Sequence, residues 1–356
     1  MNHVILKAED LGGYLTPSDR EYLDSVYRIY REAMNCYSIL DKSGSEAEKK
    51  RAEGALLRFS KDMGVIMKEV CKAEKRINVY SFEASQDNRA EISRVVAKIR
   101  DINTGNEEFS YYIQRAYEML FKLAFVGKLG SKKSSRIVKT PVTDPVQNYA
   151  VHKLTNIDDK IENAVMCVML RGALLPSMVM SKEIQEYSSG GYVTPFALFK
   201  IRRNEDRFEN DMEYILDLDR SFADPCSLKG KDLFFADPMN ATGGSLVTVV
   251  NYLLSKGIKP ASVHFFNVIA SLQGALKAVR ALENCSVYTL WMDPVLNKKA
   301  FIMPGLGDAG DRICGVDPEQ SRNIIQLIAG YGSTIVGLYR AQLREIENAV
   351  LAAGKR

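Results

Sequence analysis

Three short apolar runs, each followed at once by a loop and then a helical pattern, constrain the fold of this chain more than any other feature. The runs are Ala164–Leu170, Lys231–Ala236 and Ser262–Ala270, and a further strand-like run follows at Ser286–Met292. Runs of this length are typical of strands buried on both faces, and strands that alternate with helices form parallel sheets. The sequence therefore predicts an α/β fold, with a mostly parallel sheet flanked by helices.

The helices of this central region are marked by apolar residues at helical spacing. The pattern predicts helices over Leu246–Leu254, near Ala275–Leu282 and over Glu107–Leu123. A strand-like entry precedes them at Arg76–Phe82. Together with the three strand–loop–helix units, these segments indicate one central domain.

Helical patterns also flank this central domain at both ends of the chain. Before residue 77, two amphipathic helices are separated near Gly44, and the first has a capped start at Ser18. We therefore expect a helical N-terminal extension over 1–76, a central domain over 77–316 and a helical C-terminal extension over 317–356. No residue cluster in the extensions suggests chemistry, so packing or contact between copies of the chain is their expected role.

Composition excludes several classes of protein. The chain has 356 residues, is 46% hydrophobic and 26% charged, and has a net charge of only +4, which is typical of globular proteins and gives no general attraction to nucleic acids or membranes. The most apolar stretch, Asn163–Met180, is interrupted by Arg171 and Pro176, so no membrane span is predicted. Six scattered cysteines without a CxxC pair, and an N-terminus without a signal peptide, predict a soluble cytoplasmic protein with reduced thiols.

The segment Asp237–Ser245 is the first candidate functional loop. A buried strand ends in Asp237, a loop of small and hydroxyl-bearing residues follows, and a helix begins at once. Loop N–H groups and a helix N-terminus together favour an anion, and Gly243 and Gly244 let the backbone approach a phosphate. Asp237 is then placed for the hydroxyl groups of a phosphorylated sugar, or for a metal. The residues alone equally allow an Asp–Pro turn with a glycine-rich helix start.

The segment Phe301–Arg312 is the second candidate loop. Gly305–Gly310 satisfies the pattern GxGxxG, but Pro304 precedes the glycines and the residues from Asp311 onward are poor helix formers. A dinucleotide fingerprint needs a helix that opens on the glycines within a βαβ unit, so that function is not favoured. The segment instead predicts a loop that exposes backbone N–H and C=O groups.

Several of these motifs resemble one known family. Asp-Pro-Met-Asn-Ala-Thr-Gly-Gly-Ser at 237–245 is similar to the loop that binds 5-phosphoribosyl 1-pyrophosphate (PRPP) in type I phosphoribosyltransferases, specifically in uracil phosphoribosyltransferases. Ile302–Arg312 resembles the loop that holds the base in the same enzymes. Ile99–Phe109, the Thr-Pro-Val that begins at Thr140, and the strand end at Arg171 also match family segments in the same order. The resemblance covers roughly residues 77–316.

The resemblance implies which residues form the site. Asp237 and Arg171 would be the catalytic residues, and Asp308 would contact both substrates. The implied PRPP site consists of Arg171, Arg202, Arg203, Asp237, Pro238, Met239, Asn240, Ala241, Thr242, Gly243, Gly244, Ser245 and Asp308. The implied uracil site, read largely by backbone groups, consists of Ile302, Gly307, Asp308 and Ala309.

The resemblance also implies the reaction and its cofactor. Uracil and PRPP would give UMP and pyrophosphate in pyrimidine salvage, within a homo-oligomer. Mg²⁺ would be held by PRPP oxygens and water, without a protein metal cage, because it keeps much of its hydration.

Three departures from the family pattern leave alternatives open. The chain has Arg171-Gly-Ala where the family has Arg-Ala-Gly, and either Arg202 or Arg203 could supply the second pyrophosphate-binding arginine. The terminal extensions lie outside the usual enzyme. A non-catalytic relative that binds nucleotide or PRPP, and a phosphoribosyltransferase for another base, therefore remain as alternatives.

Overall fold

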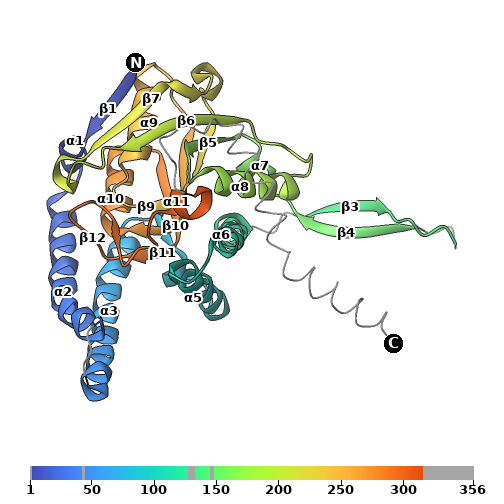
Figure 1. Ribbon diagram of the computed structural model, residues 1–356. Helices are drawn as coiled ribbons and strands as arrows, with labels where there is room; N and C mark the ends of the chain where they lie inside the picture. Colours follow the sequence, from blue (N-terminus) through green and yellow to red (C-terminus); the bar gives the residue numbers. More distant parts are fainter. Residues whose placement is uncertain (1, 42–44, 127–132, 145–147, 316–356) are drawn as a thin grey trace, which may run out of the picture.

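The strands predicted from the apolar runs form the centre of one nine-stranded sheet (Figure 1). The computed structural model describes residues 2–41, 45–126, 133–144 and 148–315. The sheet has the order β1-β7-β6-β5-β8-β10-β11-β2, and β9 pairs with β10. Its strands are β1 (His3–Lys7), β2 (Ile77–Val79), β5 (Ala164–Leu170), β6 (Phe196–Arg203), β7 (Glu213–Phe222), β8 (Asp232–Ala236), β9 (Met239–Asn240), β10 (Ser262–Ser271) and β11 (Cys285–Asp293).

Most neighbouring strands of this sheet run parallel, which confirms the predicted fold class. Within the described residues, β6, β5, β8, β10, β11 and β2 form a continuous parallel series. At one edge, β7 pairs antiparallel with β6, and β1 pairs antiparallel with β7. All seven residues of β5 are buried, as expected for a strand covered on both faces. β5, β8, β10 and β11 lie within one residue of the predicted boundaries at either end.

Helices cover both faces of the sheet. α4 (Tyr80–Glu83), α5 (Gln86–Arg100), α6 (Asn106–Phe121) and α8 (Leu174–Tyr187) pack on one face, and α9 (Gly244–Ser255) and α10 (Leu272–Ala281) pack on the other (Figure 1). The buried apolar side chains of both layers and the sheet form one continuous core. Burial of each large side chain in such a core contributes about 1.5–3 kcal/mol.

The N-terminal segment contains the expected helical hairpin. α2 (Pro17–Asp41) and α3 (Glu46–Ala73) pack along each other, and Figure 1 shows them projecting beside α10. α2 begins at Pro17 rather than after Ser18, because Thr16 and Asp19 cap it reciprocally: each backbone N–H donates to the other side chain, at 3.0 and 3.1 Å. The predicted C-terminal extension, 317–356, lies outside the described residues.

The structure corrects three sequence-based expectations. The N-terminal segment is not wholly helical, because β1 pairs with β7 at the sheet edge and α1 (Ala8–Gly12) follows it. The strand predicted over Arg76–Phe82 ends at Val79, where α4 begins. The residues after Gly310 do not form only a loop, because Ala309–Cys314 forms the short helix α11, which Asp308 caps. Tertiary packing overrides weak local propensity at these places.

The remaining elements lie outside the nine-stranded sheet. β3 (Lys133–Lys139) and β4 (Tyr149–Thr155) form a separate antiparallel hairpin that projects from the body (Figure 1), and β12 (Val295–Leu296) pairs with β13 (Ile302–Met303). Short turns of helix complete the described chain: α7 (Asp158–Ile161), a π turn at Lys122–Val126, and 3₁₀ turns at Glu209–Asp211 and Pro225–Leu228. Within the described residues, no helix is both long and apolar enough to span a bilayer.

One buried ion-pair cluster joins the helical hairpin to the sheet domain. The Arg280 guanidinium on α10 donates to Asp19 at 2.9 and 3.0 Å and also pairs with Glu74. The Asp19 side chain is only 5% exposed and that of Arg280 24%. Hydrogen bonds from Arg76 and Arg280 lower the pKa of Glu74 to about 2, so this pairing stabilises the fold above pH 4.5 and is lost as the pH falls towards 2.

We predict that Arg280→Met lowers the free energy of unfolding by about 3 kcal/mol at pH 7, because it leaves the buried Asp19 carboxylate without its partner. Arg94→Met is the matched control. Its ion pair with Glu91 is exposed, so the expected loss is under about 1 kcal/mol. Urea unfolding of the three proteins measures both values, and equal losses would contradict the assigned role of Arg280.

Candidate functional site

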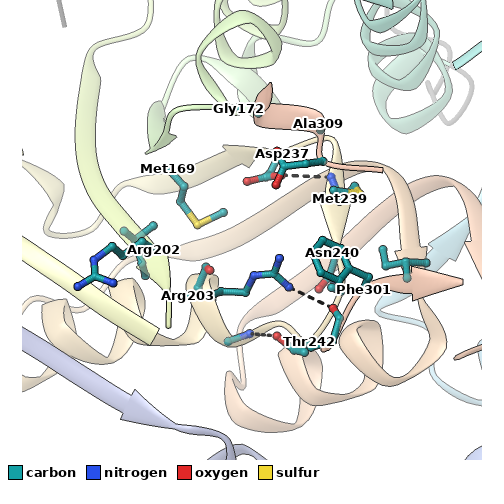
Figure 2. A pocket seen from close by; sticks show the side chains of 18 of the residues that line it. Met169, Gly172, Arg202, Arg203, Asp237, Met239, Asn240, Thr242, Phe301 and Ala309 are labelled. Atoms are coloured by element: carbon teal, nitrogen blue, oxygen red, sulfur yellow. Dashed lines mark hydrogen bonds between the residues drawn. The ribbon is translucent and has the colours of Figure 1, made fainter. Parts of the chain in front are cut away.

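The candidate site lies where the parallel strands β5, β6 and β8 end. The chain passes from β5 to β6 on one side and later returns to β8 on the other, so β5 and β8 flank a point where the strand order reverses. In open α/β sheets, ligands bind outside the carboxyl ends of the strands at such a point. A cavity of ≈ 940 Å³ lies there (Figure 2).

The cavity brings together the two candidate loops and the predicted arginines. Pro238 is the one predicted site residue that is absent from its lining, because the Pro238 carbonyl accepts hydrogen bonds from Val268 and Ile269 within the sheet. The predicted residues that do line it are Arg171, Arg202, Arg203, Asp237, Met239, Asn240, Ala241, Thr242, Gly243, Gly244, Ser245, Ile302, Gly307, Asp308 and Ala309.

The loop at 237–245 packs so closely against its neighbours that only glycine fits at two positions. Gly243 is the N-cap of α9 with φ 73°, and a Cβ there would stand 2.9 Å from the Gly274 carbonyl oxygen. A Cβ on Gly244 would stand 2.2 Å from the ring of Tyr214. The first backbone N–H groups of a helix have no acceptor within the helix, so the start of α9 offers them to an anion in the cavity.

Tyr214 orients this loop, and sequence analysis did not find it. Its hydroxyl donates to Thr242 Oγ1 at 2.5 Å, and the Gly244 N–H donates to the same oxygen at 3.3 Å. Tyr214 lies on β7, directly opposite Arg203 on β6. Burial raises the pKa of Tyr214 to about 12, so the phenol stays protonated and acts as donor. The pairing of two antiparallel strands is a tertiary feature, so no local motif marks this residue.

Asp237 stands half-buried at the end of β8. Its Oδ1 accepts a hydrogen bond from the Met239 N–H at 3.1 Å, and its backbone carbonyl accepts one from Asn267 Nδ2 at 2.9 Å. Burial raises the pKa of Asp237 to about 7, with a further contribution from the Asp308 carboxylate, while the Met239 N–H and Arg203 act in the opposite direction. The carboxyl is therefore held near the midpoint of its titration at neutral pH.

The structure distinguishes the two neighbouring arginines on β6. Figure 2 shows the Arg203 guanidinium directed towards Asn240 and Phe301, and the Arg202 guanidinium on the other side of the strand. Arg203 Nη1 donates to the Ala300 carbonyl oxygen at 3.1 Å, and its guanidinium lies 5.0 Å from the centre of the Phe301 ring. Successive side chains of a strand point to opposite faces, so only one of the pair can point into the interior of the cavity.

Arg171 follows β5 at the opposite side of the cavity. Its Nη2 pairs with Asp311 Oδ1 at 2.8 Å and its Nη1 donates to the Gly315 carbonyl oxygen at 3.1 Å. The Arg171 guanidinium thus connects the strand end to α11, which follows the second loop.

The order Arg171-Gly-Ala has a physical explanation. A Cβ at position 172 would stand 3.3 Å from both the backbone nitrogen and Cα of Gly310, so glycine allows the two loops to approach. Ala173 has φ −78° and ψ −5°, which any residue adopts, so no glycine is required there. The swap relative to the family order is therefore compatible with this site.

The second loop, at 301–312, is held by its own backbone and by a buried acid. Ile302 pairs with Leu296, Gly305 and Gly307 adopt φ 64° and 80°, and the Gly305 N–H donates to Asp293 Oδ2 at 2.9 Å. Asp308 Oδ1 accepts from the Asp311 N–H at 2.9 Å. The helix opens only after Gly307 and follows an antiparallel hairpin, so the GxGxxG match does not form a dinucleotide-binding βαβ unit.

Several cavity residues were not predicted from the sequence. Gly172 and Phe301 adjoin predicted positions, and their contacts with Gly310 and Arg203 depend on the tertiary arrangement. The other residues that line the cavity without having been predicted include Met169, Lys200, Asn204, Glu205, Asp206, Asn297, Ala300 and Met303. Asn240 was predicted, and its side-chain amide is buried with neither polar atom hydrogen-bonded among the described residues.

Metal-binding capacity at the site is limited to isolated carboxylates. Asp237 and Asp308 both line the cavity, but the described part of the chain contains no group of three or more His, Cys, Asp or Glu side chains that could hold a metal ion. A cation that arrives with an anionic ligand, and keeps its water, fits this donor set.

The chain is similar in sequence to members of one enzyme family. The sequence model of the family "Uracil phosphoribosyltransferase" matches residues 87–315. A uracil phosphoribosyltransferase of Campylobacter jejuni is 32% identical over 185 residues, which are 51% of this chain and 77% of that protein. One of Porphyromonas gingivalis is 30% identical over 229 residues, 63% of this chain and 93% of that protein. Among solved structures, the AQ2163 protein of Aquifex aeolicus is 23% identical, covers 64% of this chain and 95% of its own, and has a TM-score of 0.46.

We predict that Asp237→Asn changes stability in a pH-dependent manner. The folded pKa of Asp237, about 7, lies above its ordinary value of 3.8, so ionisation of this carboxyl destabilises the native state as the pH rises between these values. Removing the ionisable group should therefore raise the free energy of unfolding at pH 8 relative to the wild type, and should have a much smaller effect at pH 4.

Asp101→Asn provides a control of opposite sign. The Asn103 N–H donates to Asp101 at 2.9 Å and lowers its pKa, so loss of this carboxylate should weaken the fold at pH 8 and matter less at low pH. Urea unfolding at pH 4, 6 and 8 tests both variants. A pH profile of Asp237→Asn that is parallel to that of the wild type would contradict the assigned pKa.

Proposed function

The chain belongs to the uracil phosphoribosyltransferase family, and on this premise we propose that it transfers the phosphoribosyl group of PRPP to uracil, giving UMP and pyrophosphate in pyrimidine salvage. One observation carries the proposal: the same cavity is lined by the phosphate-type loop at 237–245, the loop at 301–312 and three arginines, Arg171, Arg202 and Arg203. The family membership makes the chain a transferase, and the choice of substrates is our proposal.

The loop at 237–245 suits the ribose 5-phosphate part of PRPP. The N–H groups at the start of α9 would hold the 5-phosphate. Gly243 and Gly244 let the loop pack against Gly274 and Tyr214 in the conformation that presents these groups. Asp237, in its ionised form, would accept hydrogen bonds from the ribose hydroxyl groups. The pyrophosphate would lie near Arg171, which would exchange its contact with Asp311 for the ligand, and near Arg203.

The loop at 301–312 suits a flat pyrimidine. A pyrimidine edge carries donors and acceptors side by side, so backbone groups of Ile302, Gly307 and Ala309 could read it without a charged side chain. Positive φ at Gly307 turns the backbone at this point. Asp308 would adjoin both the base and PRPP.

The chemistry requires positioning and electrostatic stabilisation more than a nucleophile. Positive charge develops at the ribose C1 while negative charge leaves on pyrophosphate, so prepositioned carboxylates and arginines act on the two developing charges. Arginine suits the leaving group because its planar fork can bind two phosphate oxygens. Mg²⁺ bound to PRPP would neutralise part of the same charge, and Asp237 and Asp308 are among the carboxylates that line the cavity.

We further propose that the protein acts as a homo-oligomer in the cytoplasm. The β3–β4 hairpin supports self-association, because Ile137, Tyr149 and Val151 are each about two-thirds exposed, and among the described residues the two strands pack mainly on each other. A two-stranded hairpin is marginally stable alone. All six cysteines are free thiols, which suits a reducing compartment.

Turnover measured with a set of bases tests the proposal. We expect the protein, with PRPP and Mg²⁺, to convert labelled uracil to UMP, and to leave cytosine, orotate and hypoxanthine unchanged. Turnover with only another base would replace uracil in the proposal. Binding of PRPP without turnover of any base would instead indicate a non-catalytic relative.

The two arginines of β6 give a sharper test of the site. We predict that Arg203→Met lowers kcat/KM for PRPP by about 10²–10³-fold, the usual loss when one charge-stabilising donor is removed. Arg202→Met, the matched control on the same strand, should change it by less than about threefold, because the Arg202 side chain is exposed on the other side. A larger loss at Arg202 would assign the pyrophosphate contact to that residue.

A further inference from the structure

The segment 99–109 matches the family but contributes no residue to the cavity lining. It forms the end of α5, the connection Asp101–Gly105 and the start of α6. Its contacts are instead directed to the two ends of the loop at 301–312. This arrangement suggests a role for a motif that the proposed function leaves without one.

Arg312 is the contact at the far end of that loop. Its Nη1 donates to the carbonyl oxygens of Ile99 and Leu306, and its Nη2 donates to those of Asp101 at 3.0 Å and Thr104 at 3.2 Å. One guanidinium thus joins the Leu306 backbone, inside the loop, to three carbonyls of the segment 99–109. No lysine could reproduce this, because an ammonium has only three donors and no planar fork.

Two further contacts fix Arg312 itself. Its guanidinium carbon lies 4.1 Å from the centre of the Phe109 ring, which is fully buried. Asn106 Nδ2 donates to the carbonyl oxygens of Arg312 at 2.6 Å and Ile313 at 2.9 Å. A side chain of α11 thus contacts the start of α6, and a side chain at the start of α6 donates to the backbone of α11.

Asp293 is the contact at the near end of the loop. This residue is 1% exposed and is the last residue of β11. Its Oδ1 accepts from Arg100 Nη2 at 2.6 Å, and its Oδ2 accepts from the Gly305 N–H at 2.9 Å. Because Arg100 belongs to the segment 99–109, the same segment holds both ends of the loop, through different residues.

We propose that Arg312 and Asp293 are positioning residues for the base, through which the segment 99–109 fixes the backbone of residues 302–309 in the shape that reads the substrate edge. The inference rests on the proposed function, since it names a base as the ligand of this loop. Neither residue lines the cavity, so neither is a catalytic residue. The loop at 237–245 is attached to different elements, β10 and Tyr214. Substitution of Arg312 or Asp293 should therefore leave its conformation unchanged.

Steady-state kinetics of Arg312→Lys, Asp293→Ala and Asp293→Asn test the proposal in the full-length protein. We expect Arg312→Lys and Asp293→Ala to raise the KM for uracil by about 10–100-fold, since small misplacements of a binding group can cost about that factor. The KM for PRPP should change by less than about twofold. Asp293→Asn keeps an oxygen that can accept from the Gly305 N–H, so it should recover part of the loss. Arg94→Met, an exposed α5 arginine, is the control and should change neither constant.

The proposal would be overturned if the KM values for uracil and PRPP rose equally, or if the rise in KM for uracil simply paralleled a fall in melting temperature. Either result would indicate a general structural role for these residues. An unchanged KM for uracil would overturn it as well. Turnover by the wild-type protein distinguishes these results from failure of the proposed function. If the wild type turns over another base and not uracil, the KM for that base is compared between the variants instead.

Hydrogen exchange provides a readout that needs no turnover. We expect the amides of residues 302–309 to exchange at least tenfold faster in Arg312→Lys than in the wild type or Arg94→Met, while those of 241–245 remain unchanged. Unchanged exchange over 302–309 would overturn the proposal even if the protein accepted no base at all.

Discussion

Close backbone packing at the ends of β5 and β8 is the constraint on which the rest of this structure depends. Four glycines make it possible: Gly172 faces Gly310, and Gly243 faces Gly274. A Cβ on Gly274 would stand 2.5 Å from the Ala241 carbonyl oxygen, so a side chain there would push the anion-type loop away from α10. Because these loops meet through backbone, peptide groups line much of the cavity, and they can bind a phosphate or a base edge directly.

The charges of the site follow from this packing. Asp237 and Asp308 face one cavity with Arg171 and Arg203, so ligand charge is met by groups already fixed in place. Burial of Asp237 raises its pKa to about 7, so ionisation of this carboxyl costs stability as the pH rises. Part of the stability of the fold at neutral pH is thus given up to hold a carboxylate in the cavity.

A second set of residues supports the two cavity-lining loops without lining the cavity itself. Tyr214 orients Thr242 in the loop at 237–245, while Arg312 and Asp293 hold the loop at 301–312. Each support connects a loop to an element distant in the sequence. The loops at 237–245 and 301–312 therefore have separate supports.

The sequence by itself determined the α/β class, the boundaries of β5, β8, β10 and β11, and the two loops, because buried strands and glycine-rich turns carry local signals. Pattern and propensity failed at β1, which needs β7 as a partner, and at α11, which depends on its cap at Asp308 and on packing against α6. Only the tertiary structure directed the Arg203 side chain, and not that of Arg202, towards Asn240 and Phe301 (Figure 2), left Pro238 out of the cavity lining, and placed Tyr214, Asp293 and the segment 99–109 against the two loops. These choices depend on strand pairing and on contacts between residues as many as 213 positions apart, which no local pattern of residues encodes.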